Sequence, residues 1–325
     1  MTTKKIKYCL TVLLLSSVTM FGQELSGISG SFVDLGFGTR ASGMGNAFTA
    51  QSDDANSVFW NPGGLVASEK IKIDFNYINQ LGIIPYSSLG AVIPIGKKDA
   101  VGAGLIYSGD AALKELTFVA GYARELGDLT VGANLKYRYA SFGKNNFSAG
   151  DYTVFDNGEI TEGEQNKIFG SGNGFGMDLG VKYSLTKSVT LGLVVKDFLS
   201  PFYWNSENKN TLNPARGEYN EAMPVKTIAG FSFNSHTGFI VNGDYQPAIL
   251  KDEINVIRFG AEYTVFDIIS FRAGTQQFIN SLPDEKYSFG VGFTYGLGGL
   301  KVLANYAYVL EQLANTSRFS IGVNF

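Results

Sequence analysis

Cysteine and histidine are scarce in this sequence of 325 residues, and each scarcity excludes a class of function. The only cysteine, Cys9, lies in an N-terminal segment that we expect to be removed, which leaves no disulfide, thiol nucleophile or thiolate metal site. The only histidine, His236, falls in a predicted turn, where a Ser-His-Asp triad or a histidine-based metal site is not expected. We therefore predict a protein without catalytic residues, metal or cofactor.

Charge and long apolar runs are also limited. Charged residues make up 17% of the chain, below the usual quarter, and the formal net charge is −3 with scattered basic residues. Such a chain lacks the basic patch that nucleic-acid binding requires. After residue 23 no apolar run reaches 18 residues, so helical membrane spans are excluded. What the chain does have is 40 glycines and 14% aromatic residues.

Residues 1–23 have the pattern of a secretory signal peptide. Three lysines at positions 4, 5 and 7 precede an apolar stretch from Tyr8 to Phe21, and small or polar residues follow at Gly22 and Gln23. The apolar stretch is short for a spanning helix, which needs roughly 20 residues. We predict cleavage after Gln23. A single N-terminal membrane anchor is the competing interpretation.

From residue 70 onward, apolar and polar residues alternate with period two. In residues 70–79, for example, Ile73, Phe75 and Tyr77 alternate with Asp74 and Asn76. Period two with one continuous apolar face is typical of β-strands. About 14 such runs of 9–13 residues, the length of a tilted membrane-spanning strand, begin near residues 70, 86, 99, 114, 128, 174, 187, 224, 237, 254, 267, 286, 299 and 315.

The fold predicted from this pattern is an all-β, transmembrane antiparallel β-barrel spanning residues 70–325. The connections support it, because long ones (143–173, 200–222, 247–252 and 280–285) alternate with tight turns near residues 127, 186, 234, 266 and 298. The apolar face would contact outer-membrane lipid, and the face with charges such as Lys136, Asp178 and Glu262 would line the lumen. The alternation ends in a C-terminal phenylalanine, which resembles the signal read by the barrel-assembly machinery. A soluble β-sandwich or propeller would not explain an aromatic face on every strand.

Residues 24–69 do not alternate and carry a glycine-rich motif instead. The motif residues that stand out are Arg40, Ala41, Gly43, Met44 and Gly45, then Asp53, Asp54 and Ala55, and then Asn61, Pro62, Gly64 and Leu65. This pattern resembles the N-terminal signature of the PorV/PorQ group of Bacteroidota outer-membrane proteins, with Gly63 where alanine is usual. That group is related to FadL-type transporters, which are 14-stranded barrels with an N-terminal hatch.

The resemblance implies that residues 24–69 form a plug or hatch segment inside the barrel. An ion pair between Arg40 and Asp53 or Asp54 would hold the segment in the lumen. Asn61, Pro62 and the glycines that follow have the composition of a turn. We expect these motif residues to act as a structural scaffold and not as a ligand site.

The resemblance also implies two alternative functions. The first is an accessory or shuttle protein of type IX secretion, which binds a translocon barrel or the C-terminal domains of cargo through extracellular loops. The second is a FadL-like transporter for a small hydrophobic ligand. A purely structural barrel is a third possibility. Clustered aromatic residues in the connection 200–222, which we predict to be exposed, favour the first: Phe202, Tyr203, Trp204 and Tyr219. An aromatic girdle at the outer-leaflet interface is the alternative explanation for this cluster.

Overall fold

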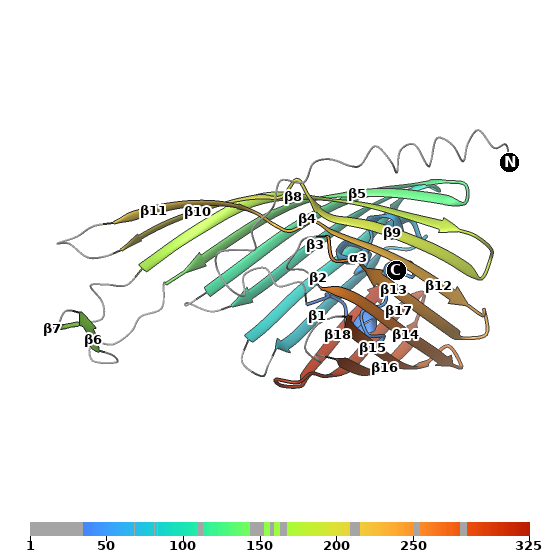
Figure 1. Cartoon of the computed structure of the whole chain (residues 1–325). Helices are drawn as coiled ribbons and strands as arrows, with labels where there is room; N and C mark the ends of the chain where they lie inside the picture. Colours follow the sequence, from blue (N-terminus) through green and yellow to red (C-terminus); the bar gives the residue numbers. More distant parts are fainter. Residues whose placement is uncertain are drawn as a thin grey trace.

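The computed structural model describes residues 35–67, 69–80, 82, 84–109, 113–143, 153–156, 159–162, 168–208, 215–249, 254–279 and 285–325 (Figure 1). The predicted signal peptide, residues 1–23, lies outside the described residues. None of the helices in the described ranges has the length and hydropathy to cross a membrane.

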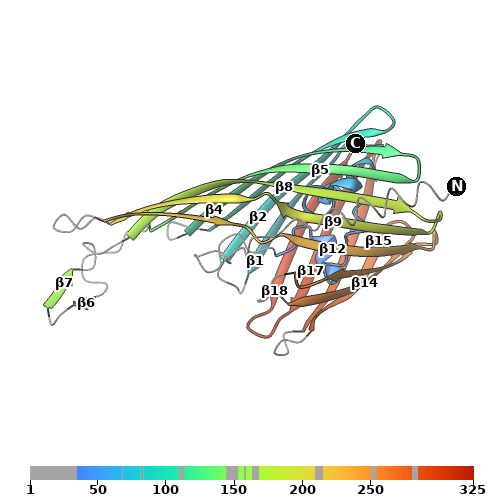
Figure 2. The same ribbon diagram turned by 45° about the horizontal axis from the view of Figure 1, so that its top comes forward.

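Fourteen antiparallel strands form a closed barrel (Figures 1 and 2). They are β1 (Lys72–Gln80), β2 (Ile84–Ile95), β3 (Asp99–Gly109), β4 (Leu113–Leu126), β5 (Leu129–Phe142), β8 (Ile168–Ser184), β9 (Val189–Phe198), β12 (Lys226–Asn234), β13 (Phe239–Gln246), β14 (Asn255–Val265), β15 (Ile269–Ile279), β16 (Lys286–Leu297), β17 (Leu300–Leu310) and β18 (Thr316–Asn324). The first and last strands pair from Lys72 with Asn324 to Asn79 with Ser317, which closes the ring. The predicted strand number is confirmed.

The two faces of the wall differ as the alternation predicts. In β1, Phe75 is 48% exposed on the outer surface, whereas Asp74 and Asn76 point inward and are buried. The same holds around the ring, where large apolar side chains cover the outside of every barrel strand. So large an exposed apolar surface suits a lipid environment and would be a liability in water.

The connections divide between the two ends of the barrel. Tight turns lie at one end; the two-residue turn Gly298–Gly299, for example, has positive φ at both positions, as a type I′ hairpin turn requires. The long connections lie at the other end and were predicted without strands. This part of the prediction was wrong. A short hairpin, β6 (Thr153–Asp156) with β7 (Glu159–Glu162), lies in the first long connection.

The second long connection forms a hairpin that extends the barrel wall. Strand β10 (Pro201–Asn208) pairs with the first residues of β8, and β11 (Arg216–Ala222) pairs with β10. We call β10 and β11 the rim hairpin; Figure 2 shows it continuing the wall beyond the neighbouring strands. Strand β8 also begins six residues earlier than expected, because the positions opposite its glycine face, Ser171 and Asn173, are polar and give no apolar alternation.

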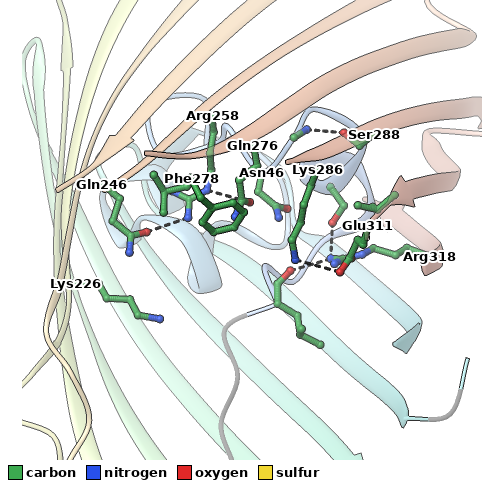
Figure 3. A pocket seen from close by; sticks show the side chains of 15 residues that line it. Asn46, Lys226, Gln246, Arg258, Gln276, Phe278, Lys286, Ser288, Glu311 and Arg318 are labelled. Carbon is green, nitrogen blue, oxygen red and sulfur yellow. Dashed lines mark hydrogen bonds and ion pairs between the residues drawn. The ribbon is translucent and has the colours of Figure 1, made fainter. Parts of the chain in front are cut away.

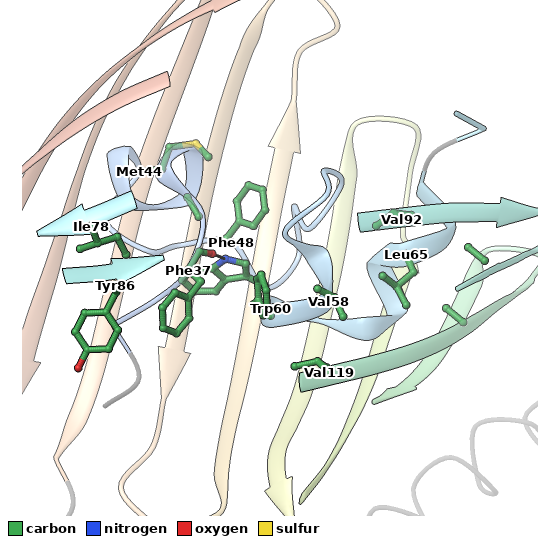
Figure 4. Close-up of a cluster of buried hydrophobic side chains, with 14 residues drawn as sticks. Phe37, Met44, Phe48, Val58, Trp60, Leu65, Ile78, Tyr86, Val92 and Val119 are labelled. Carbon is green, nitrogen blue, oxygen red and sulfur yellow. Dashed lines mark hydrogen bonds between the residues drawn. The ribbon is translucent and has the colours of Figure 1, made fainter. Parts of the chain in front are cut away.

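Residues 35–67, here called the inner segment, lie inside the barrel. The segment contains α2 (Thr39–Gly43), α3 (Ser57–Trp60) and the 3-10 helix η1 (Pro62–Ala67). Its apolar side chains form a buried cluster with inward-facing residues of the wall (Figure 4). The cluster includes Phe37, Met44, Phe48, Val58, Trp60 and Leu65 of the segment and Ile78, Tyr86, Val92 and Val119 of β1, β2 and β4. The hatch role of residues 24–69 stays a prediction.

Candidate functional site

Arg40 joins the inner segment to strand β14 of the barrel wall. Its Nε and Nη2 donate to the two carboxylate oxygens of Glu262 in β14 at 2.9 and 2.7 Å. Its Nη1 lies 2.5 Å from Oδ1 of Asp53 and 3.8 Å from Oδ2 of Asp54. Arg272 in β15 donates from Nε to Glu262 at 2.5 Å. The guanidinium of Arg40 therefore joins β14 to the turn at Asp53 through charge-assisted bonds, and Glu262 extends the network to Arg272 in β15.

The two aspartates of the motif have different electrostatic surroundings. Burial, the largest effect, raises the pKa of Asp53, but the charges of Arg40, Lys72 and Lys182 outweigh it and hold the pKa below its ordinary value. Burial and, less strongly, the neighbouring charge of Asp53 raise the pKa of Asp54. Asp54 also accepts a hydrogen bond from the Asn56 amide, which shapes the turn into α3. Both carboxylates thus have structural partners.

The glycines of the motif allow the backbone of the inner segment to contact the backbone of the barrel wall directly. Gly45 has φ +63, and a Cβ there would lie 2.5 Å from the Thr275 nitrogen in β15. Its own amide donates to Ser288 Oγ at 2.9 Å. Gly43 and Met44 lie beside inward-facing glycines of β16 and β14 in the same way. These positions act through close contact with the wall.

Asn61 and Pro62 place the end of the segment against β5 and β8. The Asn61 amide donates to the carbonyl oxygens of Thr49 and Val181 at 2.9 and 3.1 Å. The Pro62 carbonyl group occupies the space that a side chain at position 132 of β5 would fill, and residue 132 is a glycine. Eight residues of the motif therefore contact the wall or the segment itself, and one of them, Gly45, also lines a cavity. The eight are Arg40, Gly43, Met44, Gly45, Asp53, Asp54, Asn61 and Pro62.

A polar cavity of about 330 Å³ lies inside the barrel beside the inner segment (Figure 3). Its charged lining consists of four basic residues, Lys226, Arg258, Lys286 and Arg318, and one acidic residue, Glu311. Lys286 pairs with Glu311 at 3.0 Å. Arg318 donates from Nη1 to the carbonyl oxygens of Leu35 and Gly36. The sequence did not single out this cavity, because its lining comes from strands whose register only the closed barrel reveals.

The rim hairpin is fixed to the wall by a cluster of charges at its base. Lys136 lies 2.6 Å from Asp178 and 3.0 Å from Asp197, and Arg138 lies 2.6 Å from Asp197. Arg138 also donates to Ser200 Oγ at 2.9 Å. Asp197 has φ +59 at the point where the chain leaves β9. The cluster therefore holds the sharp turn from which β10 starts. We predicted from the sequence that Lys136 and Asp178 face the lumen, but Asp197 was not among the predicted lumen charges.

The structure corrects the exposure that we predicted for the aromatic residues of this connection. Tyr203 and Tyr219 are exposed, but Phe202 and Trp204 are buried. Both rings lie over Gly172 of β8, and their centroids are 4.7 Å apart. The Trp204 Nε1 donates to Glu221 at 2.6 Å. Phe202 and Trp204 thus stabilise the hairpin and are not available as contact residues, whereas a contact role of Tyr203 and Tyr219 stays a prediction.

Gly172→Leu is expected to detach the rim hairpin without opening the barrel. A Cβ at this position would lie 2.4 Å from Phe202 and 2.7 Å from Trp204, so the rings have to leave the strand. Limited proteolysis of residues 201–222 should then be faster by about tenfold or more. Gly296→Leu is the matched control, because nothing lies within 4 Å of its Cβ position. Equal cleavage of the two variants would show that the rings do not hold the hairpin.

His236 lies in the tight turn between β12 and β13, where its ring contacts the Lys187 carbonyl oxygen at 2.9 Å. Across the described ranges, no group of three or more histidine, cysteine or acidic side chains could hold a metal ion.

Comparison with known families matches residues 50–325 to a model described as "Type IX secretion system membrane protein PorP/SprF". The chain belongs to this family. The match begins after Gly45, so the first part of the glycine-rich motif lies outside it. It supports the predicted link to type IX secretion, and membership of the PorV/PorQ group in particular stays a prediction. No curated protein matches the chain.

Solved structures similar to this PorP/SprF-family chain are FadL-like barrels. They include a CymD monoaromatic hydrocarbon channel (TM-score 0.59, 18% identity, 88% of this chain and 96% of that chain) and the Pseudomonas putida toluene transporter TodX (0.56, 14%, 89% and 97%). A Pseudomonas aeruginosa FadL homologue is also similar (0.56, 12%, 88% and 97%). These likenesses show the fold. Fold and family together indicate an outer-membrane barrel.

Proposed function

We propose that this PorP/SprF-family barrel is a non-enzymatic accessory or shuttle protein of type IX secretion. In this role it binds a component of the system, either the translocon barrel or the C-terminal domain of a cargo protein, at the end of the barrel that carries the long connections. By the topology of outer-membrane barrels that end faces the cell exterior.

The observation that carries this proposal is the construction of the rim hairpin. A loop that binds no other protein does not need a fixed conformation. This hairpin, in contrast, is held against the wall by packing of two aromatic rings and by a charge cluster, which consists of Lys136, Arg138, Asp178 and Asp197. Such support fixes a surface in one conformation before binding, which lowers the entropic cost of binding a partner.

The test is removal of residues 201–222 in a strain that secretes type IX cargo. The barrel should still assemble, because the hairpin pairs only with the first residues of β8. Cargo in the medium should fall to near the level of a strain without the protein. His236→Ala at the opposite end is the control and should secrete normally. Normal secretion by the deletion variant would refute the proposal.

The second candidate function, transport of a small hydrophobic compound, is favoured by the fold shared with hydrocarbon channels. The cavity in the lumen argues against transport of such a compound. Four basic residues line that cavity, so a hydrophobic compound would gain little binding free energy there. Uptake of such a compound that depends on the barrel while secretion does not would reverse this preference.

A further inference from the structure

Strand β11 has a hydrogen-bonded neighbour on one side only. In the sixteen-stranded sheet of the described residues, every other strand lies between two neighbours, and β11 pairs with β10 alone. Residues 216–220 are exposed. Unpaired edges attract other strands, and proteins protect many of them with prolines, bulges, charged side chains or short strands. β11 contains no proline, and its register with β10 is continuous from Pro201–Ala222 to Glu207–Arg216.

The register between β10 and β11 shows which backbone groups of β11 point toward its open edge. Asn208 N donates to Ala215 O at 3.1 Å, and Met223 N donates to Ser200 O at 2.9 Å. Hydrogen-bonded pairs alternate along an antiparallel ladder, so odd-numbered residues of β11 direct their N–H and C=O groups toward β10. The even-numbered residues Arg216, Glu218 and Asn220 therefore direct theirs toward the open edge, at the spacing that a further strand would match.

This edge is also held rigidly. β10 pairs with β8 over seven residues, from Phe202–Gly174 to Asn208–Ile168. Trp204 in β10 donates to Glu221 in β11 and so joins the two strands of the hairpin through their side chains. An edge that is already in strand conformation loses little entropy when another strand is added.

We propose that the open edge of β11 receives an extended segment of a secreted polypeptide as an additional β-strand. This inference rests on the proposed function and specifies its binding mode. The added strand makes backbone hydrogen bonds to Arg216, Glu218 and Asn220. Strands β10 and β11 carry the acids Glu207, Glu218 and Glu221 against one base, Arg216, so basic side chains on the added strand are favoured. A second copy of this acid-rich hairpin is disfavoured for the same reason.

The first test follows amide hydrogen exchange in the full barrel, using as probe a purified C-terminal domain of a type IX cargo protein from the same organism. With the probe bound, the amides of Glu218 and Asn220 should exchange about 100-fold more slowly. The amides of Gly217 and Tyr219, already bonded to β10, should change little. Uniform protection of all four amides, or none, would overturn strand addition.

The second test uses proline, which removes one N–H. Asn220→Pro and Glu218→Pro remove groups that face the open edge and leave the bonds to β10 in place. Probe affinity should fall by about tenfold or more. The controls Asn220→Ala and Glu218→Ala keep the N–H and should stay within about threefold of the unchanged barrel.

The outcomes separate the two proposals. If the proline variants bind normally but removal of residues 201–222 abolishes binding, strand addition is wrong and the proposed function stands. If the alanine variants lose as much affinity as the proline variants, side chains and not the backbone edge make the contact. If even the deletion variant binds the probe normally, the rim hairpin is not the contact surface, and both strand addition and the role of the hairpin in the proposed function are wrong. Dimers of the barrel that the proline variants abolish would identify a second copy as the occupant and overturn the proposal.

Discussion

Arg40→Met is expected to lower the free energy of unfolding of the barrel by about 3–5 kcal/mol, the usual cost of breaking a buried ion pair by removing one partner. Glu262 is buried, and without Arg40 it keeps only Arg272 as a charged partner. Asp53 and Asp54 at the same time lose the guanidinium that lies between them and Glu262. Denaturant unfolding in detergent micelles, followed by intrinsic fluorescence, measures the change.

Further variants make this result specific. Arg124→Met removes the exposed pair with Asp99, whose charged atoms are 3.4 Å apart, and should cost at most about 1 kcal/mol. Glu262→Met leaves Arg272 without its carboxylate partner and should also be destabilising. The double variant with Arg40→Met should lose less than the sum of the two single losses, because both changes remove the same ion pair. If Arg40→Met and Arg124→Met unfold alike, the ion pairs do not hold the inner segment.

Gly45→Ala is expected to be about as damaging, at about 3 kcal/mol, although it adds a single carbon atom. The new Cβ would lie 2.5 and 2.7 Å from the backbone nitrogen and oxygen of Thr275. These atoms belong to the barrel ladder and cannot move without breaking it. The same unfolding experiment measures the effect, and the temperature at which the folded band disappears in gel electrophoresis gives a second reading.

Gly82→Ala is the matched control for Gly45→Ala. Gly82 also has a positive φ, +74, but nothing lies within 4 Å of its Cβ position. It therefore carries only the conformational cost of an L-residue in the left-handed region, about 1 kcal/mol. The difference between the two variants isolates the contact between segment and wall, and equal losses would contradict that contact.

The sequence predicts the wall of this barrel well for a physical reason. Lipid on one side and a polar lumen on the other enforce period two in every spanning strand, and all 14 predicted strands are present. The rim hairpin lies beyond the wall, where no lipid enforces that pattern. Its buried and exposed aromatic residues, such as Trp204 and Tyr203, were therefore indistinguishable in the sequence.

The motif of the inner segment was visible in the sequence, but most of its partners were not. Arg40 and Asp53 are 13 residues apart in one motif, and their pairing was predicted. Glu262 is 222 residues away, and its approach depends on how far the strands are staggered around the ring. One sequence does not contain that stagger. The PorV/PorQ resemblance drawn from this motif likewise stays a prediction, since the family match covers only its second part.

The inner segment precedes every strand in the chain, yet some of its partners are among the last residues to be made. Arg318 donates to the carbonyl oxygen of Leu35, which is 283 positions earlier. Contacts of such high order form slowly, because the loop between them has to close first. Because the segment packs against strands on several sides of the lumen, we expect it to dock while the wall forms and before β1 and β18 pair. The order of these two steps therefore matters for assembly. If β1 and β18 paired before the inner segment docked, the barrel would close with an empty lumen.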